Sequence, residues 1–170
     1  MSDNYDKKQF LMQYGFATRR MLAAEYEYME FSYSLIGKGV TYDGMPHGGP
    51  SGDSMAAIIA KKLELEKTML AEITMLGDVR MRIREKIEAL PTEAEKLVLT
   101  LRYMNLVPVH GDDGTRVVGY DWKPWHKVAE GACFTTRHTL RLHGIALSHL
   151  SITPEEFAAV GMRAANARCH

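Results

Sequence analysis

The sequence has few cysteines, no long apolar run and no excess of charge of either sign. Its two cysteines, Cys133 and Cys169, are too few for a disulfide framework, which favours a reducing, cytoplasmic location. No apolar run approaches the ~20 residues that cross a bilayer, and the polar start does not resemble a secretory signal, so we expect no membrane partner. Lys and Arg total 21, as do Asp and Glu, which excludes a uniformly basic nucleic-acid coat.

This zero net charge conceals an uneven distribution. Residues 97–153 carry six basic and four acidic side chains together with five of the seven histidines. No acidic side chain occurs from Gly131 to Thr153, and Arg137 and Arg141 stand one helical turn apart in that stretch. A polyanion is expected to meet this stretch, although a short helix that merely lacks Asp and Glu would give the same pattern.

The first half of the chain predicts two long helices, over residues 5–36 and 54–89. In both, apolar residues recur at alternating spacings of three and four, and neither contains an interior proline. Residues 37–53 hold six glycines and two prolines, which is typical of a loop, and no phosphate-binding GxxxxGK[ST] pattern occurs there. Residues 1–89 are therefore expected to form an antiparallel helical hairpin, an arm whose remaining apolar stripe needs a partner. That partner is either the C-terminal domain or a second copy of the chain, and we favour the second, a homodimer.

Shorter elements follow from residue 90 onward. Thr92 and Glu95 fit a capping box that opens a helix over 93–105. Residues 107–121 place β-branched residues on both sides of Gly-Asp-Asp-Gly and predict a β-hairpin. His110 beside Asp112 and Asp113 offers metal-ligand chemistry, but a turn built from Asp and Gly explains the same residues.

The next segment predicts two helices separated by a tight turn. A short helix is expected over 123–131, a turn at Cys133-Phe134, and a further helix to about residue 150, capped by Thr135 or Thr136. Ala129 takes the small-residue place at which two helices of a helix-turn-helix cross closely. Core positions are expected at Val128, at Leu147, and at Leu140 or Leu142. Residues 151–170 hold a last helix, opened by Thr153-Pro154-Glu155-Glu156, and a tail.

Three segments carry a family resemblance. The strings LPTEAEKLVLTLRY (90–103), WHKVAE (125–130) and RHTLRLHGIAL (137–147) resemble the opening helix, the following helix and the recognition helix of bacterial sigma factor region four. The chain is most similar to phage- and prophage-encoded ArpU-type and RinA-type late transcription regulators and to an uncharacterised relative of them. These proteins combine a two-helix N-terminal region, a Met-Pro-containing loop (here 42–48) and an Arg-Leu-His-Gly-x-Ala-Leu ending. The resemblance spans roughly residues 35–150.

The resemblance implies a mainly all-α fold, in which the long hairpin precedes a region-four-like helix-turn-helix domain (90–150) with the β-hairpin 107–121 inserted. It also implies binding to double-stranded promoter DNA and control of phage or prophage genes, without catalysis or a cofactor. RNA polymerase is a further candidate partner. Carried over by position, the candidate DNA-binding residues lie on the recognition helix and on the helix before it: Thr135, Thr136, Arg137, His138 and Arg141, and Lys123, His126 and Lys127.

The Arg137 guanidinium can donate two hydrogen bonds to a guanine, while threonine hydroxyls and the amides at a helix N-terminus can donate hydrogen bonds to phosphate. Two positions depart from the family pattern. Cys133 stands in the turn where the family usually has glycine, and Thr139 stands in the recognition helix where the family has an apolar residue. The hairpin is expected either to act as a wing, with Arg116 contacting phosphate, or to cap the core.

Two other functions compete with DNA binding. The first is a zinc or thiol site, but the spacings of its four candidate residues match no metal-ligand pattern: His126, Cys133, His138 and His143. Histidines on a DNA-facing or solvated helix face are the preferred interpretation. The second alternative is a non-catalytic helical interaction protein that binds RNA polymerase or another phage protein instead of DNA, and the zero net charge favours it.

Overall fold

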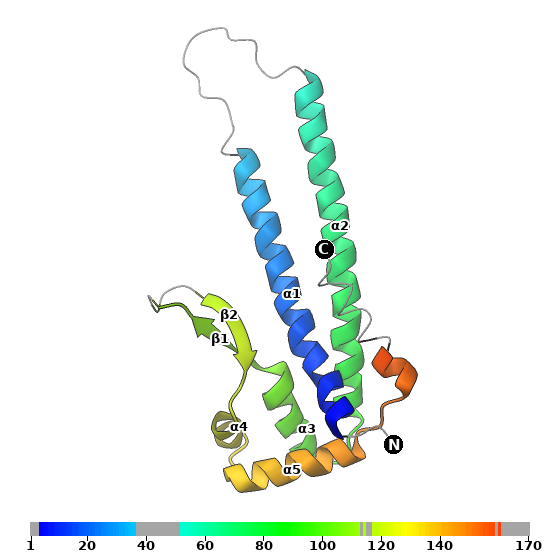
Figure 1. Cartoon of the computed structure of the whole chain (residues 1–170), viewed down its shortest axis with the longest axis vertical. Coiled ribbons are helices and arrows are strands. Elements are labelled where there is room, and N and C mark those ends of the chain that lie inside the picture. Colours follow the sequence, from blue (N-terminus) through cyan, green and yellow to red (C-terminus); the bar gives the residue numbers. More distant parts are fainter. Residues whose placement is uncertain (1–3, 37–51, 113, 115–116, 159, 161–170) are drawn as a thin grey trace. The chain divides into compact units, whose positions relative to one another are not determined.

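The computed structural model describes residues 4–36, 52–112, 114, 117–158 and 160. These residues are mostly helical with one two-stranded antiparallel sheet, which confirms the expected mainly-α fold with a small β-hairpin (Figure 1). The chain divides into two compact units, which we call unit 1 (Met1–Arg20 with Leu76–His170) and unit 2 (Met21–Met75). In the described part of the chain, no helix is both long and apolar enough to cross a membrane.

The two long helices are α1 (Asn4–Ile36) and α2 (Gly52–Glu88), close to the predicted ranges. Gly52 and Asp53, which we assigned to the loop, instead begin α2, and the rest of that predicted loop lies outside the described residues.

In each unit a polar contact joins the two helices. In unit 1 the Arg80 guanidinium donates to the Tyr14 hydroxyl at 3.0 Å, and in unit 2 the Tyr28 hydroxyl donates to the Glu66 carboxylate. The hydrogen bond to Tyr14 gives the Arg80 guanidinium a polar partner among the apolar residues of this part of α2.

Helix α3 (Glu93–Leu99) begins at the predicted cap but ends early. The Thr92 hydroxyl accepts a hydrogen bond from the Glu95 amide at 3.3 Å. The predicted capping box is only half correct, because the Glu95 carboxylate contacts His149 at 2.9 Å instead of returning to the start of its own helix. The helix expected to reach residue 105 changes at Thr100 into a π-helix, η1 (Thr100–Met104). A π-turn changes which side chains share a face, and here both Leu101 and Tyr103 are buried.

The predicted β-hairpin is confirmed as β1 (Leu106–His110) paired antiparallel with β2 (Val117–Trp122). Its last residue, Trp122, packs on α1: the Phe16 ring meets the indole edge-to-face at 5.5 Å, and the Arg19 guanidinium lies 4.3 Å from the indole centroid. A Cβ on Gly15 would lie 3.0 Å from the indole nitrogen, so a larger residue at this position would require the indole to shift by a few tenths of an ångström. Asp113 and the candidate wing residue Arg116 lie outside the described residues.

The last described segment is helical over 154–158 and at 160. Its start is a reciprocal capping box: the Thr153 hydroxyl accepts from the Glu156 amide at 3.2 Å, and the Thr153 amide donates to the Glu156 carboxylate at 3.0 Å. Lys86 of α2 forms an ion pair with Glu156 at 2.9 Å, and the side chain of Val160 is buried. The predicted N-terminal signature is therefore correct here.

Candidate nucleic-acid interface

Two helices joined by a tight turn carry six of the eight candidate DNA-binding residues: α4 (Trp125–Gly131) and α5 (Thr136–His149), and a seventh, Thr135, is the N-cap of α5. Helix α4 begins two residues later than predicted, because Pro124 adopts an extended conformation as its N-cap and a proline also disfavours helix in the preceding residue. The assignment of Lys123 to this helix is therefore wrong. Its carbonyl instead accepts a hydrogen bond from Arg102, whose guanidinium lies 4.8 Å from the Trp125 centroid.

The turn between α4 and α5 contains a residue in the left-handed conformation. Cys133 has φ of +57°, and it is the one non-glycine residue with positive φ in the described part of the chain. The Phe134 amide then donates back to the Ala129 carbonyl at 2.9 Å and closes the turn. A cysteine at the position where the family pattern has glycine thus adopts the backbone conformation that glycine adopts most easily.

Of the two predicted caps of α5, Thr135 and Thr136, the structure shows Thr135 as the N-cap. Its hydroxyl accepts from the His138 amide at 3.3 Å, and its carbonyl accepts from the Thr139 hydroxyl at 3.1 Å. Thr139 is fully buried at the position where the family pattern has an apolar residue. The hydrogen bond to its own helical turn satisfies the hydroxyl, so the polar side chain is accommodated in the core.

The inner faces of α4 and α5 pack on the helical turn 98–101. Ala129 is buried, as its close-contact position predicts, and Leu147 is also buried. Of the two leucines left open, Leu142 packs against the core, whereas Leu140 is 46% exposed. The core cluster at this contact consists of Val98, Leu101, Val128 and Ala132, with Trp125, Phe134 and Leu142 packed against it.

The prediction that the histidines of α5 face DNA or solvent is wrong for His143, which is buried. It is 6% exposed, its Nε2 lies 3.0 Å from the Tyr103 hydroxyl, and its ring meets Trp125 edge-to-face at 4.8 Å. Burial, aided by the nearby charges of Lys8 and Arg102, lowers the pKa of His143 to about 4, so the ring is neutral at pH 7. Burial also raises the pKa of Tyr103 to about 12. The pair is part of the core and does not belong to the candidate interface.

The opposite side of α5, which we call its outer face, consists of Arg137, Leu140, Arg141, Gly144 and Ser148. Arg137 and Arg141 are exposed, and neither guanidinium has a hydrogen bond or ion pair with any residue that the structure describes. The first turn of α5 contains no acidic side chain. Two unneutralised cations therefore point outward from one side of a helix whose other side is buried.

The remaining candidates lie around the same helix start. Thr136 and His138 are exposed on the first turn of α5, and the His138 ring packs edge-to-face on Phe134 at 5.0 Å. On α4, His126 and Lys127 are exposed. Lys127 pairs with Glu130 at 2.9 Å, and this hydrogen bond lowers the pKa of the Glu130 carboxyl. Solvent screens this exposed pair, so Lys127 can exchange the carboxylate for another anion at little cost.

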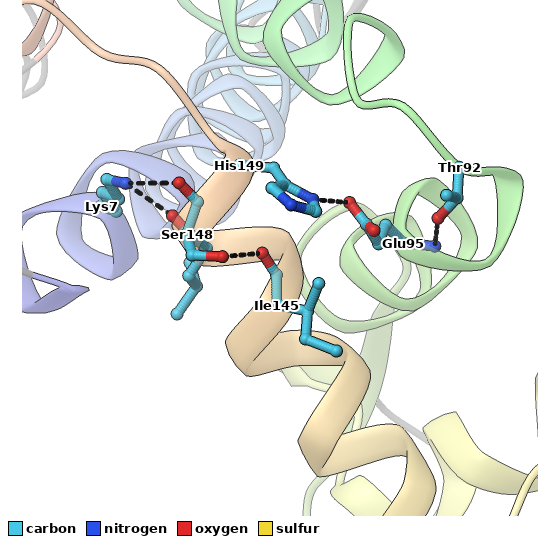
Figure 2. Close-up of polar contacts among 7 residues, drawn as sticks. Lys7, Thr92, Glu95, Ile145, Ser148 and His149 are labelled. Carbon is cyan, nitrogen blue, oxygen red and sulfur yellow. Dashed lines mark hydrogen bonds and ion pairs between the residues drawn. The ribbon is translucent and has the colours of Figure 1, made fainter.

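The C-terminal end of α5 is held by contacts that the sequence analysis missed (Figure 2). The Lys7 ammonium of α1 donates to the carbonyls of Leu147 and Ser148 at 2.6 and 3.4 Å, where a helix leaves carbonyls without partners. Glu95 of α3 is buried and contacts His149. Both contacts join residues far apart in the sequence, and the capping-box pattern at Glu95 pointed to a different partner.

In the described residues, no group of three or more His, Cys, Asp or Glu side chains is placed to hold a metal ion. Glu130, which lies seven residues before Arg137 in the sequence, is paired with Lys127. Comparison of the chain with protein-family models, with curated proteins and with solved structures finds no match.

Proposed function

We propose that the protein binds double-stranded DNA through the outer face of α5 and regulates transcription of phage or prophage genes. One observation carries the DNA-binding part of the proposal: Arg137 and Arg141 are exposed, one turn apart, and without polar partners in the described chain. Uncompensated guanidinium groups on a rigid helix suit phosphate and guanine, both of which accept two hydrogen bonds from arginine. The regulatory part follows from the resemblance to ArpU-type and RinA-type regulators.

The geometry of α5 is compatible with the major groove. A 14-residue helix is ~21 Å long, and a groove ~12 Å wide admits one helix. The N-terminal amides of α5 and the Thr136 hydroxyl lie where phosphate contacts position a recognition helix. His126 and Lys127 supply a second set of exposed donors on α4. The contacts at Leu147, Ser148 and His149 fix the opposite end of α5, which would keep its base-reading side chains in register with the phosphate contacts.

The test compares two double variants that remove the same charge. Arg137→Ala with Arg141→Ala deletes the outer-face cations, whereas Arg82→Ala with Arg84→Ala deletes two exposed cations of α2. Fluorescence anisotropy of a labelled DNA duplex measures affinity, and circular dichroism measures unfolding. We expect the outer-face variant to lose at least a hundredfold in affinity with unchanged unfolding, and the α2 variant to bind like the wild type.

The salt dependence of the same binding reaction separates DNA binding from the rival function. Neutralising Z phosphates lowers log K with a slope near −0.9Z against log salt, so each lost phosphate contact makes the slope shallower by about 0.9. A protein that binds only RNA polymerase or another phage protein would show no such binding to the isolated duplex. Equal affinities and equal slopes for the wild type and the outer-face variant would remove the proposal.

A second candidate function, self-association through the helical arm, is favoured by the exposed apolar residues of unit 2. Six large apolar side chains of this unit are at least half exposed: Tyr26, Met29, Tyr33, Ile59, Leu63 and Leu70. Tyr26, Met29 and Tyr33 recur at spacings of three and four, which places them on one side of α1. We propose that a second copy of the chain covers these side chains. Light scattering at tens of micromolar should give a dimer, and a monomer would contradict this proposal.

A further inference from the structure

One large apolar side chain lies among the cations of the outer face. Leu140 is 46% exposed and follows Arg137 by three residues, so the two side chains are neighbours on the helix surface, and Arg141 lies one turn from Arg137. Leu142, two residues on, fills the core position that either leucine was expected to take. Leu140 therefore has no role in the described core.

A single exposed leucine on a protein surface is ordinary. What distinguishes Leu140 is the glycine one turn beyond it. Gly144 lies inside α5, where glycine favours the helix less than alanine does. A Cβ at Gly144 would meet no described atom within 4 Å, so packing within the chain does not require glycine there. The missing side chain leaves the helix backbone open to close approach from outside, next to Leu140.

We propose that Leu140 is a specificity-determining residue. Its side chain contacts the C5-methyl group of a thymine close to the guanine that Arg137 binds. This inference rests on the proposed DNA-binding function of the outer face. The thymine methyl is the apolar group that the major groove displays, and apolar side chains read it. Residues three apart on a helix rise by ~4.5 Å, which is comparable with the ~3.4 Å between base pairs. Gly144 permits the helix to approach closely enough for this contact.

The test uses two random 20-base-pair duplex libraries, one containing thymine and one containing deoxyuridine, which differ only in the C5-methyl group. The wild type, Leu140→Ala and Leu97→Ala select from both libraries. Leu97 is the matched control, because it is a 40% exposed leucine on α3 of the same unit.

We expect the wild type and Leu97→Ala to select a guanine with a thymine at a fixed offset, and to bind that duplex about fivefold more tightly than its deoxyuridine counterpart. Leu140→Ala should still select the guanine but bind both duplexes equally. Gly144→Ala should unfold at a higher temperature than the wild type, because alanine favours helix, and yet bind the selected duplex at least fivefold more weakly.

The outcomes separate this inference from the function on which it rests. A wild type that selects a motif but binds the thymine and deoxyuridine forms equally overturns the role of Leu140, and so does a Leu140→Ala variant that keeps the methyl preference. Tighter or unchanged binding by Gly144→Ala overturns the close approach at α5. A wild type that enriches nothing from either library overturns both this inference and the proposed DNA-binding function.

Discussion

The same two helices have different environments in the two units. In unit 1 the apolar stripes of α1 and α2 are fully buried, and this unit also contains α3, α4, α5 and the hairpin. In unit 2 the only apolar residue that is buried, among those described, is Ala24, although the spacing of apolar residues continues through it. A helical stripe therefore indicates which side of a helix tends to be covered, whereas burial depends on whether further elements cover it.

The largest expected effect contrasts a buried and an exposed leucine of the two units. Leu147 of α5 is 1% exposed, so Leu147→Ala should lower the free energy of unfolding by about 3 kcal/mol through lost burial and a residual cavity. Leu63 of α2 is 59% exposed, and Leu63→Ala should change the unfolding of the monomer by less than about 0.5 kcal/mol. Urea unfolding at submicromolar protein measures both. Equal losses would show that unit 2 is covered as completely as unit 1.

Acid should destabilise unit 1 through His143. Since its pKa is about 4 when folded and near 6.5 when unfolded, the unfolded chain binds the extra proton as the pH falls between these values. The contribution of neutral His143 to the free energy of unfolding is therefore fully present above about pH 6.5. The free energy of unfolding falls by about 3 kcal/mol by pH 4. His143→Gln, which keeps a hydrogen-bonding group for Tyr103, should flatten this dependence relative to the wild type.

Tryptophan fluorescence isolates the response of unit 1 to pH. Both tryptophans, Trp122 and Trp125, belong to unit 1, so their emission follows that unit alone, whereas helical circular dichroism follows both units. Denaturant unfolding followed by both signals at pH 4 to 8 makes the comparison. The same pH dependence in the wild type and in His143→Gln would show that His143 is not responsible.

The exposed stripe of unit 2 should affect association and leave folding unchanged. Tyr33→Ser combined with Leu63→Ser removes two of its most exposed apolar side chains, and we expect the dimer to dissociate at least tenfold more readily. Sedimentation velocity over a concentration series measures the change. Leu97→Ser, an exposed leucine of unit 1, is the control and should leave association unchanged. A dimer equally stable in both variants would place the contact elsewhere.

The smallest effect is expected in the turn of unit 1. Cys133→Gly should raise the free energy of unfolding by about 0.5–1 kcal/mol, because glycine adopts positive φ without the penalty of a side chain and loses only part of this gain to its freer unfolded state. Cys133→Ala keeps the penalty and should leave stability near that of the wild type. Thermal unfolding distinguishes the two variants, and a less stable Cys133→Gly would contradict this interpretation of the turn.

Local patterns predicted the elements and caps well. The long helices followed from the apolar spacing, the hairpin from its glycine-flanked turn, and the starts of α3 and α5 from threonine caps at Thr92 and Thr135. Two errors occurred where residues far apart in the sequence contact each other. Glu95 fits a capping box, yet it contacts His149, which is 54 residues away in the sequence. From the sequence, His143 was expected on the surface, but in the structure it is buried against Tyr103 and Trp125. No local sequence pattern distinguishes a buried histidine from an exposed one on such a helix.

The candidate interface was predicted in part. Arg137 and Arg141 were recognised from the acid-free stretch and lie exposed on one side of α5. Lys123 lies outside α4 because Pro124 is the N-cap of that helix and disfavours helix in the preceding residue. The choice between Leu140 and Leu142 needed the three-dimensional direction of α5, since alternate residues of a short amphipathic helix both lie near the edge of its apolar side. Within the outer face, the exposure of Leu140 was established only by the structure.

The most direct test of the central claim, that the outer face of α5 contacts DNA, uses the exposed thiol of Cys133 beside the start of that helix. In a Cys169→Ser background, an iron chelate attached to Cys133 generates radicals that cut nearby DNA backbone. With the duplex selected by the wild type, we predict cuts confined to one short window beside the selected guanine, and none when Arg137→Ala and Arg141→Ala are added. Cuts spread evenly along the duplex, or the same window in the doubly substituted protein, would contradict the account.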